Sequence, residues 1–305
     1  MSRPVAVTVR VPATSANLGA GFDTLGLALD LYDTVTIRIA QRGADSVTIR
    51  GEGADTLARD GSHLIISTLR RGLAARGVDV PALRLSARNR IPQARGLGSS
   101  AAAVVAAMAA VQVLAGSRRL ERAALIDAAA RVEGHADNVA ACVFGGLTIA
   151  WEQGDRFRAT SLRCARGVAA IALVPQARSA TARTRKLLPA HVPHADAAFT
   201  AAHSALTVAA LTRAPELLPD ALDDRIHEPY RRRAMRSSCD LVDRLRDAGL
   251  AAAISGGGSS VLVLHDSTSQ SSRTAIHREV SRLAGDEFRV LPLAINTIGV
   301  TATAH

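Results

Sequence analysis

The feature that most constrains the fold is a glycine-rich stretch running directly into an apolar segment, PQARGLGSSAAAVVAA at residues 92–107. Gly96 and Gly98 allow the backbone to approach another group closely, because glycine has no side chain beyond Cα. Ser99 and Ser100 are favoured N-cap types, and the alanines and valines that follow favour a buried helix. Free N–H groups at a helix start bind anions. The stretch therefore predicts a phosphate-binding loop before a helix that begins near Ser99.

Two common phosphate-binding loops fit this stretch poorly. The P-loop of nucleoside triphosphatases needs a lysine after its last glycine, and the only lysine of the chain is the distant Lys186. The dinucleotide-binding pattern is formally matched by Gly96, Gly98 and Ala101. However, Pro92 interrupts the approach to the loop, and no second strand ends in an acidic residue about 20 positions later.

The order P-x-x-x-G-L-G-S-S-A-A instead resembles the central motif of the GHMP small-molecule kinases. PATSANLGAGFDTLG at 12–26 is similar to the N-terminal motif of one branch of this family, the homoserine kinases. HADNVAACVFGG at 135–146 and DDRIHEPYRRR at 223–233 resemble later motifs of the branch. SGGGSSV at 255–261 resembles the last one, with Ser259 in place of the usual proline. The resemblance covers nearly the whole chain and implies ATP-dependent phosphorylation of L-homoserine to O-phospho-L-homoserine, in threonine biosynthesis.

The resemblance also implies an α+β chain with the two-domain GHMP kinase fold. Its N-terminal domain is of the ribosomal protein S5 domain 2-like type and its C-terminal domain is ferredoxin-like. A turn at Gly154–Asp155 places the boundary there, giving an ATP-binding domain at 1–155 and a second domain at 156–305. Alternating valines predict a strand at 5–11 that Pro12 ends. Other patterns predict a strand at 168–174 and helices at 62–75 (with Ser62 as N-cap), from Ser117 or Glu121 to Val132, at 198–214 and at 275–284. The last glycine loop is expected to pack beside the phosphate loop.

The resemblance places four polar residues at the amino-acid substrate and the reacting hydroxyl. Asn17 and Asp23 would hold the α-ammonium group, although asparagine and aspartate are also common turn formers. His135 and Asn138 would be the catalytic residues that orient the hydroxyl. In other GHMP kinases an aspartate occupies about the place of Asn138. An amide does not usefully accept a proton at neutral pH, so we expect the hydroxyl proton to pass to solvent or to the γ-phosphate.

Two arginines are expected to bind the substrate carboxylate, because a guanidinium group can donate two parallel hydrogen bonds to it. The segment RSATARTRKLLP at 178–189 resembles a family motif that points to Arg185, with Arg183 as the alternative. The later segment HEPYR supplies Arg231, with Arg225 as the alternative.

The cofactors implied are ATP and Mg²⁺. Residues expected to bind ATP are Pro92, Gln93, Ala94, Arg95, Gly96, Leu97, Gly98, Ser99, Ser100, Ala101 and Ala102. Ser100 (or Ser99) and Glu133 are expected to hold Mg²⁺, with Asp127 as the alternative to Glu133. Relatives often place an asparagine against the nucleotide near the start of the helix at 62–75, whereas His63 lies about there in this chain, so the adenine contacts are left open.

Composition limits the other functions. The net charge of +10 is typical of nucleic-acid binding, but the arginines are scattered and only 3% of the residues are aromatic, which disfavours a nucleic-acid partner. Three dispersed cysteines, no signal-peptide pattern and no apolar run long enough for a bilayer predict a cytoplasmic protein without a membrane partner. A homodimer is left open. The alternatives are a kinase for another small amino alcohol such as L-threonine, or a basic nucleic-acid-binding protein with a degenerate kinase fold.

Overall fold

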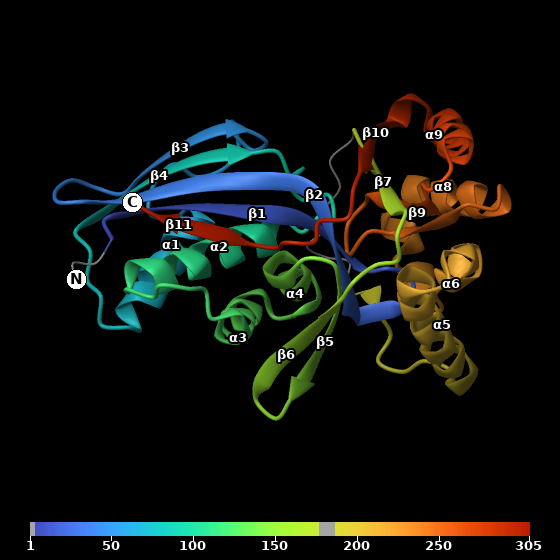
Figure 1. Ribbon diagram of the computed structural model, residues 1–305, viewed down its shortest axis with the longest axis horizontal. Helices are drawn as coiled ribbons and strands as arrows, with labels where there is room; N and C mark the ends of the chain where they lie inside the picture. Colours follow the sequence, from blue (N-terminus) through green and yellow to red (C-terminus); the bar gives the residue numbers. More distant parts are fainter. Residues whose placement is uncertain (1–3, 177–186) are drawn as a thin grey trace.

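The computed structural model describes residues 4–176 and 187–305, which form two β-sheets with helices packed on each (Figure 1). The strands are β1 Ala6–Asn17, β2 Gly21–Ala40, β3 Ser46–Gly51, β4 Ala82–Asn89, β5 Leu147–Gln153, β6 Arg156–Leu162, β7 Val168–Pro175, β8 Ala251–Ile254, β9 Val261–Asp266, β10 Phe288–Leu293 and β11 Thr301–Ala304. The α-helices are α1 Leu64–Ala74, α2 Ser99–Leu114, α3 Arg122–Glu133, α4 Asp137–Phe144, α5 His194–Thr212, α6 Leu218–Ala221, α7 Glu228–Arg231, α8 Arg236–Asp247 and α9 Gln270–Ala284. None of the helices in these two ranges is long and apolar enough to cross a membrane.

The first sheet is built on the long antiparallel pair β1–β2. Its strands run in the order β11-β1-β2-β4-β3, and β5 pairs with β2 and carries β6. Figure 1 shows α1 to α4 on one side of this sheet. Helix α2 contacts α1, α3, α4 and β1, which explains why its alanines and valines are buried around nearly the whole helix. The core of this part fixes the start of α2, where the glycine-rich loop ends.

The expectation that Pro12 ends the first strand is wrong. Strand β1 continues to Asn17, and its pairing with β2 shifts register between Pro12 and Ala13 and again between Ala16 and Asn17. Such register shifts bend a strand, and a proline can be accommodated within a strand at these positions. As a result, β1 reaches the phosphate loop, where the Thr14 N–H donates to the carbonyl oxygen of Leu97 at 3.2 Å.

The second sheet has the order β10-β7-β9-β8 and is antiparallel throughout. Helices α8 and α9 pack on it over a separate apolar core. The division of the chain at residue 155 stays a prediction, and strand pairing does not follow it. Strand β6 pairs with β5 across that position, and β11 returns from the second part to pair with β1.

Two helix starts differ from the sequence prediction in their capping residue. Helix α2 begins at Ser99 as predicted, but its N-cap is Gly98 in the left-handed conformation, at φ 69°. Helix α1 begins at Leu64, and its N-cap is His63 rather than Ser62. Strand β7 and helices α3, α5 and α9 lie where the sequence patterns predict them, with ends shifted by a few residues.

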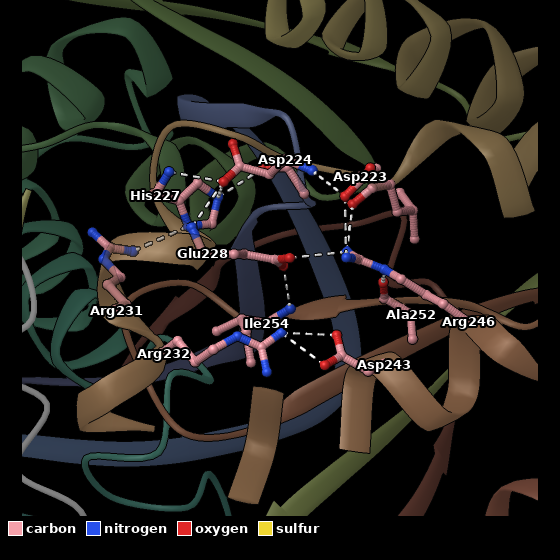
Figure 2. Close-up of polar contacts among 12 residues, drawn as sticks. Asp223, Asp224, His227, Glu228, Arg231, Arg232, Asp243, Arg246, Ala252 and Ile254 are labelled. Atoms are coloured by element: carbon pink, nitrogen blue, oxygen red, sulfur yellow. Dashed lines mark hydrogen bonds and ion pairs between the residues drawn. The ribbon is translucent and has the colours of Figure 1, made fainter. Parts of the chain in front are cut away.

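A buried carboxylate joins three elements of the second part. Glu228, at the start of α7, accepts a hydrogen bond from the Ile254 N–H at 2.9 Å and from Nη2 of Arg246 at 3.0 Å (Figure 2). Ile254 ends β8 and Arg246 lies in α8. The Glu228 side chain is 9% exposed, so these contacts replace most of the hydration of the carboxylate. They fix α7 relative to the glycine loop that follows β8.

Replacing Arg246 by alanine should lower the free energy of unfolding by about 2–3 kcal/mol, because it leaves the buried Glu228 carboxylate without its guanidinium partner. The matched control is Arg282→Ala. Arg282 pairs with Glu279 on the exposed face of α9, and its loss should leave the urea midpoint nearly unchanged. Equal urea midpoints for the two variants would contradict the role assigned to the buried pair.

Candidate active site

The glycines of the phosphate loop are needed for close contacts within the protein. Gly96 and Gly98 both have positive φ, at 81° and 69°. A Cβ at Gly96 would lie 2.2 Å from the carbonyl oxygen of Ser255, and a Cβ at Gly98 would lie 2.0 Å from Oγ1 of Thr14. A side chain at either position would therefore push the loop away from its neighbours.

The glycine loop between β8 and β9 packs against the phosphate loop, as the sequence predicted. The Ser260 N–H donates to the Arg95 carbonyl at 3.0 Å, and the Ser255 hydroxyl donates to the Gly96 carbonyl at 2.7 Å. Ser259, which replaces the usual proline, accepts a hydrogen bond at its carbonyl oxygen from the hydroxyl of Ser238 at 2.6 Å. One backbone hydrogen bond and two from serine hydroxyl groups thus hold this loop in place without the proline.

One cavity of about 530 Å³ lies at the meeting point of these loops. It brings together most of the residues predicted for the site: Asn17, Asp23, Ala94, Gly96, Gly98, Ser99, Ser100, Ala101, Glu133, His135, Asn138 and Arg231. Gly256, Gly257 and Gly258 close its other side. Pro92, Arg95 and Leu97 belong to the loop but do not line a described cavity, and Arg183 and Arg185 lie outside the described residues.

A second cavity of about 440 Å³ lies on the other side of the phosphate loop and shares Ala94, Ser99 and Ser100 with the first. Gln93, Ala102 and His63 also line it, among mostly apolar side chains. Nδ1 of His63 accepts the Ile65 N–H at 3.2 Å, and burial lowers the pKa of this imidazole. The neutral ring therefore carries its proton on Nε2 and is a donor there.

Asp33 is a buried carboxyl group in the wall of this second cavity. Burial raises its pKa to about 6, although the backbone N–H groups of Arg90 and Ile91 donate to Oδ1 at 2.6 and 2.9 Å and oppose that rise. These bonds also fix the end of β4 where the chain enters the phosphate loop. Sequence reasoning missed Asp33, because no motif marks it.

The structure distinguishes the two candidate metal ligands. The Ser100 hydroxyl donates to Oε1 of Glu133 at 2.7 Å, so both oxygens meet at the first cavity. Asp127 instead accepts the Phe157 N–H at 3.0 Å and pairs with Arg131 at 3.3 Å, against the β5–β6 hairpin. No group of three or more His, Cys, Asp or Glu residues suited to a metal occurs in the described part of the chain. A hydroxyl and one carboxylate fit Mg²⁺, which binds few protein ligands beside phosphates and water.

The two predicted catalytic residues are held by two residues that sequence reasoning passed over. Nδ1 of His135 lies 2.7 Å from Oδ1 of Asp137, and the Asn138 N–H donates to the same oxygen at 2.6 Å. The Thr14 hydroxyl donates to Oδ1 of Asn138 at 2.8 Å. Asp137 and Thr14 both lie inside the motifs quoted above, so their place in those motifs could have identified them as site residues. Nδ2 of Asn138 donates one hydrogen to Oδ1 of Asp137 at 3.4 Å, and its second hydrogen can contact a ligand.

The predicted substrate residues meet at the carbonyl oxygen of Gly256. Nδ2 of Asn17 donates to it at 2.9 Å and Nη1 of Arg231 at 3.4 Å. Oδ1 of Asn17 also accepts the backbone N–H of Asp23 at 3.1 Å, so Asn17 orients the start of β2, which carries Asp23. The alternative arginine, Arg225, lies over the ring of Phe199 on α5 and does not line the cavity. The geometry therefore favours Arg231.

Comparison with known proteins identifies the family of this chain. The family model for the GHMP kinases N terminal domain matches residues 63–146, and the model for the GHMP kinases C terminal matches residues 206–283. A homoserine kinase from Streptomyces coelicolor is 45% identical over 301 residues, which cover 98% of this chain and 95% of the relative. The chain belongs to the homoserine kinase family.

Solved structures confirm the two-domain fold expected for this family. The crystal structure of a homoserine kinase from Cytophaga hutchinsonii superposes with a TM-score of 0.84 at 25% identity, over 99% of both chains. A protein described as MDDEF in complex with MVAPP, AMPPCP and magnesium has a TM-score of 0.70 at 15% identity, over 99% of both chains. Because the sequence identity is only 15%, the similarity to this second structure supports the shared fold alone.

A Gly98→Ala variant should lower kcat at least about tenfold, because its Cβ would displace Thr14 and with it Asn138. Gly116→Ala is the matched control at the opposite end of α2. Gly116 also has positive φ, at 101°, but a Cβ there meets nothing within 4 Å. Steady-state kinetics should show normal turnover for Gly116→Ala. An equal loss in both variants would mean that backbone strain, rather than the contact with Thr14, is responsible.

Proposed function

We propose that this chain transfers the γ-phosphoryl group of ATP to the side-chain hydroxyl of L-homoserine and forms O-phospho-L-homoserine. One observation carries the proposal: a single cavity is lined by a phosphate-type loop, by a hydroxyl–carboxylate pair suited to a metal, and by Asp23 and Arg231. The two charged residues of opposite sign complement the ammonium and carboxylate groups of a free amino acid. The family to which the chain belongs supports the same reaction.

ATP would occupy both cavities across the phosphate loop. The triphosphate would lie on the N–H groups from Gly96 to Ser100, at the start of α2, where the helix termini leave unpaired donors. The adenine would enter the second cavity, whose mostly apolar walls suit an aromatic base and where Nε2 of His63 can donate to a ring nitrogen.

Mg²⁺ would be held by Ser100 and Glu133, beside the terminal phosphates. When bound, the ion neutralises phosphate charge that develops during transfer. The chain's own contribution is to hold the two oxygen ligands together at the N-terminus of α2, through the 2.7 Å hydrogen bond between them.

The amino acid would be held by its two charged groups. Arg231 would bind the α-carboxylate, together with Arg185 from the segment outside the described residues. Asp23 would accept the α-ammonium group. Asn17 supports this arrangement indirectly, because its amide is hydrogen-bonded to the Asp23 N–H and to the Gly256 carbonyl.

Catalysis would depend on positioning rather than on a side-chain base. Nδ2 of Asn138 and the imidazole of His135 would orient the substrate hydroxyl toward the γ-phosphate, and Thr14 and Asp137 hold these two groups in place. Phosphoryl transfer needs alignment and charge stabilisation more than proton abstraction. The hydroxyl proton would pass to solvent or to the γ-phosphate.

A coupled ADP-release assay with Mg-ATP tests the function directly. L-Homoserine should be turned over with kcat/KM at least about tenfold above that for L-threonine, a constitutional isomer whose hydroxyl is on the β-carbon and whose side chain ends in a methyl group. L-Serine, mevalonate and galactose are the further comparison substrates. Activity confined to L-threonine would assign the chain to another amino alcohol, and no turnover with any of the five would refute an amino-acid kinase.

Glu133→Gln should raise the Mg²⁺ concentration needed for half-maximal activity at least about tenfold, because an amide is a weaker ligand for a hard cation than a carboxylate. Asp127→Asn is the matched control on the same helix, since Asp127 faces the β5–β6 hairpin. Magnesium titrations of initial rate measure both. A larger shift for Asp127→Asn would transfer the metal site to that residue.

The cytoplasmic location, the homodimer and the lack of a nucleic-acid partner stay predictions. Several of the arginines responsible for the basic charge are engaged within the protein, as Arg70 is with Asp45 and Arg246 is with Glu228. This use of arginine is in keeping with a small-molecule enzyme.

A further inference from the structure

His227 connects the two parts of the chain directly behind the substrate site. Its side chain is fully buried, and Nε2 lies 2.8 Å from the carbonyl oxygen of Gly19, in the turn between β1 and β2. A carbonyl oxygen can only accept, so Nε2 carries the hydrogen. In the neutral ring Nδ1 then has a free lone pair, and it faces Nη1 of Arg231 at 3.5 Å (Figure 2).

The neighbours of His227 fix the ring in this orientation. The ring stacks on Phe22, with centroids 5.3 Å apart and an angle of 28° between the planes. The Asp224 carboxylate accepts the backbone N–H of His227 at 2.8 Å and lies 3.7 Å from Nε2. A Cβ at Gly19 would lie 2.1 Å from the Leu222 carbonyl oxygen, so the turn fits tightly against this segment.

These contacts form a closed series of hydrogen bonds beside Asp23 and Arg231, the two residues proposed to bind the amino acid. Asn17 and Arg231 both donate to the Gly256 carbonyl, Arg231 contacts His227, and His227 donates to Gly19, which follows Asn17 by two residues. Asp23 and Arg231 come from segments far apart in the sequence. The α-ammonium and α-carboxylate groups of an amino acid are bonded to the same carbon, so the residues that bind them must keep a fixed separation.

We propose that His227 is a positioning residue that sets the separation between Arg231 and the start of β2, which carries Asp23. This inference rests on the proposed function, because it assumes that these two residues bind a free amino acid. His227 does not line the cavity and is fully buried, so it acts through Arg231 rather than on the substrate. An imidazole suits this task, because one rigid ring presents a donor to Gly19 and an acceptor to Arg231.

Two conservative variants separate the two contacts. His227→Asn keeps an acceptor near the position of Nδ1 and removes the donor to Gly19. His227→Gln can reach Gly19 with its amide nitrogen and removes the acceptor from Arg231. Each should raise KM for L-homoserine at least about tenfold while KM for ATP changes less than about twofold.

The matched control is His265→Asn. His265 is also a buried histidine, 5% exposed, but it lies on β9 away from the cavity. It should leave KM for L-homoserine unchanged, and urea midpoints should confirm that all three variants fold.

Two readouts separate positioning from a general structural defect. 3-Aminopropan-1-ol keeps the amine and hydroxyl of homoserine but lacks the carboxylate, so its inhibition constant should change less than about threefold in the His227 variants. In an Arg231→Lys background, His227→Asn should raise KM for L-homoserine by no more than about twofold further, because its effect passes through Arg231.

Parallel increases in KM for ATP and L-homoserine, or full additivity with Arg231→Lys, would overturn the positioning role. Failure of the unaltered protein to phosphorylate L-homoserine would instead overturn the proposed function, so the two failures are distinguishable.

Discussion

The site depends on the close contact between two backbone loops that are far apart in the sequence. The nearest atoms of the phosphate loop and of the loop after β8 leave no room for a Cβ at Gly96 or Gly258. Carbonyl groups of the phosphate loop accept hydrogen bonds from Ser255 and Ser260. The conformation of the phosphate loop is therefore set by the C-terminal half of the chain, and the nucleotide site is not a property of the first sheet alone.

The same contact explains how charged groups can be buried at the substrate site. Arg231 is 2% exposed, and burying a guanidinium group is costly unless polar groups replace its water. The Gly256 carbonyl supplies one such group and also accepts from Asn17. A carbonyl oxygen carries only a partial negative charge and does not neutralise the guanidinium group. Burial in a low-dielectric site strengthens the attraction between such a group and a carboxylate, so the position of Arg231 matters to the proposed binding.

The sequence predicted correctly those parts of the structure whose conformation is determined by residues that are neighbours along the chain. The start of α2 follows from the glycines, serines and alanines around it, and a glycine, Gly134 in the left-handed conformation, ends α3. Pro12 was misjudged, because its tolerance within β1 depends on register shifts against β2 that no local pattern records. The return of β11 to β1 and the burial of Asp33 likewise depend on contacts between distant segments. The resemblance supplied the site residues, but not Thr14 or His227, whose partners are known only once the chain is folded.

The surroundings of Asn138 bear on the proposed transfer without a side-chain base. Oδ1 of the Asp137 carboxylate accepts the Asn138 N–H and faces Nδ1 of His135. The Thr14 hydroxyl donates to Oδ1 of Asn138. These contacts orient the Asn138 amide and the His135 ring at a cavity that the Asp23 and Glu133 carboxylates also line. Donors stabilise the negative charge on the phosphates and align the hydroxyl, which is where phosphoryl transfer gains most of its rate.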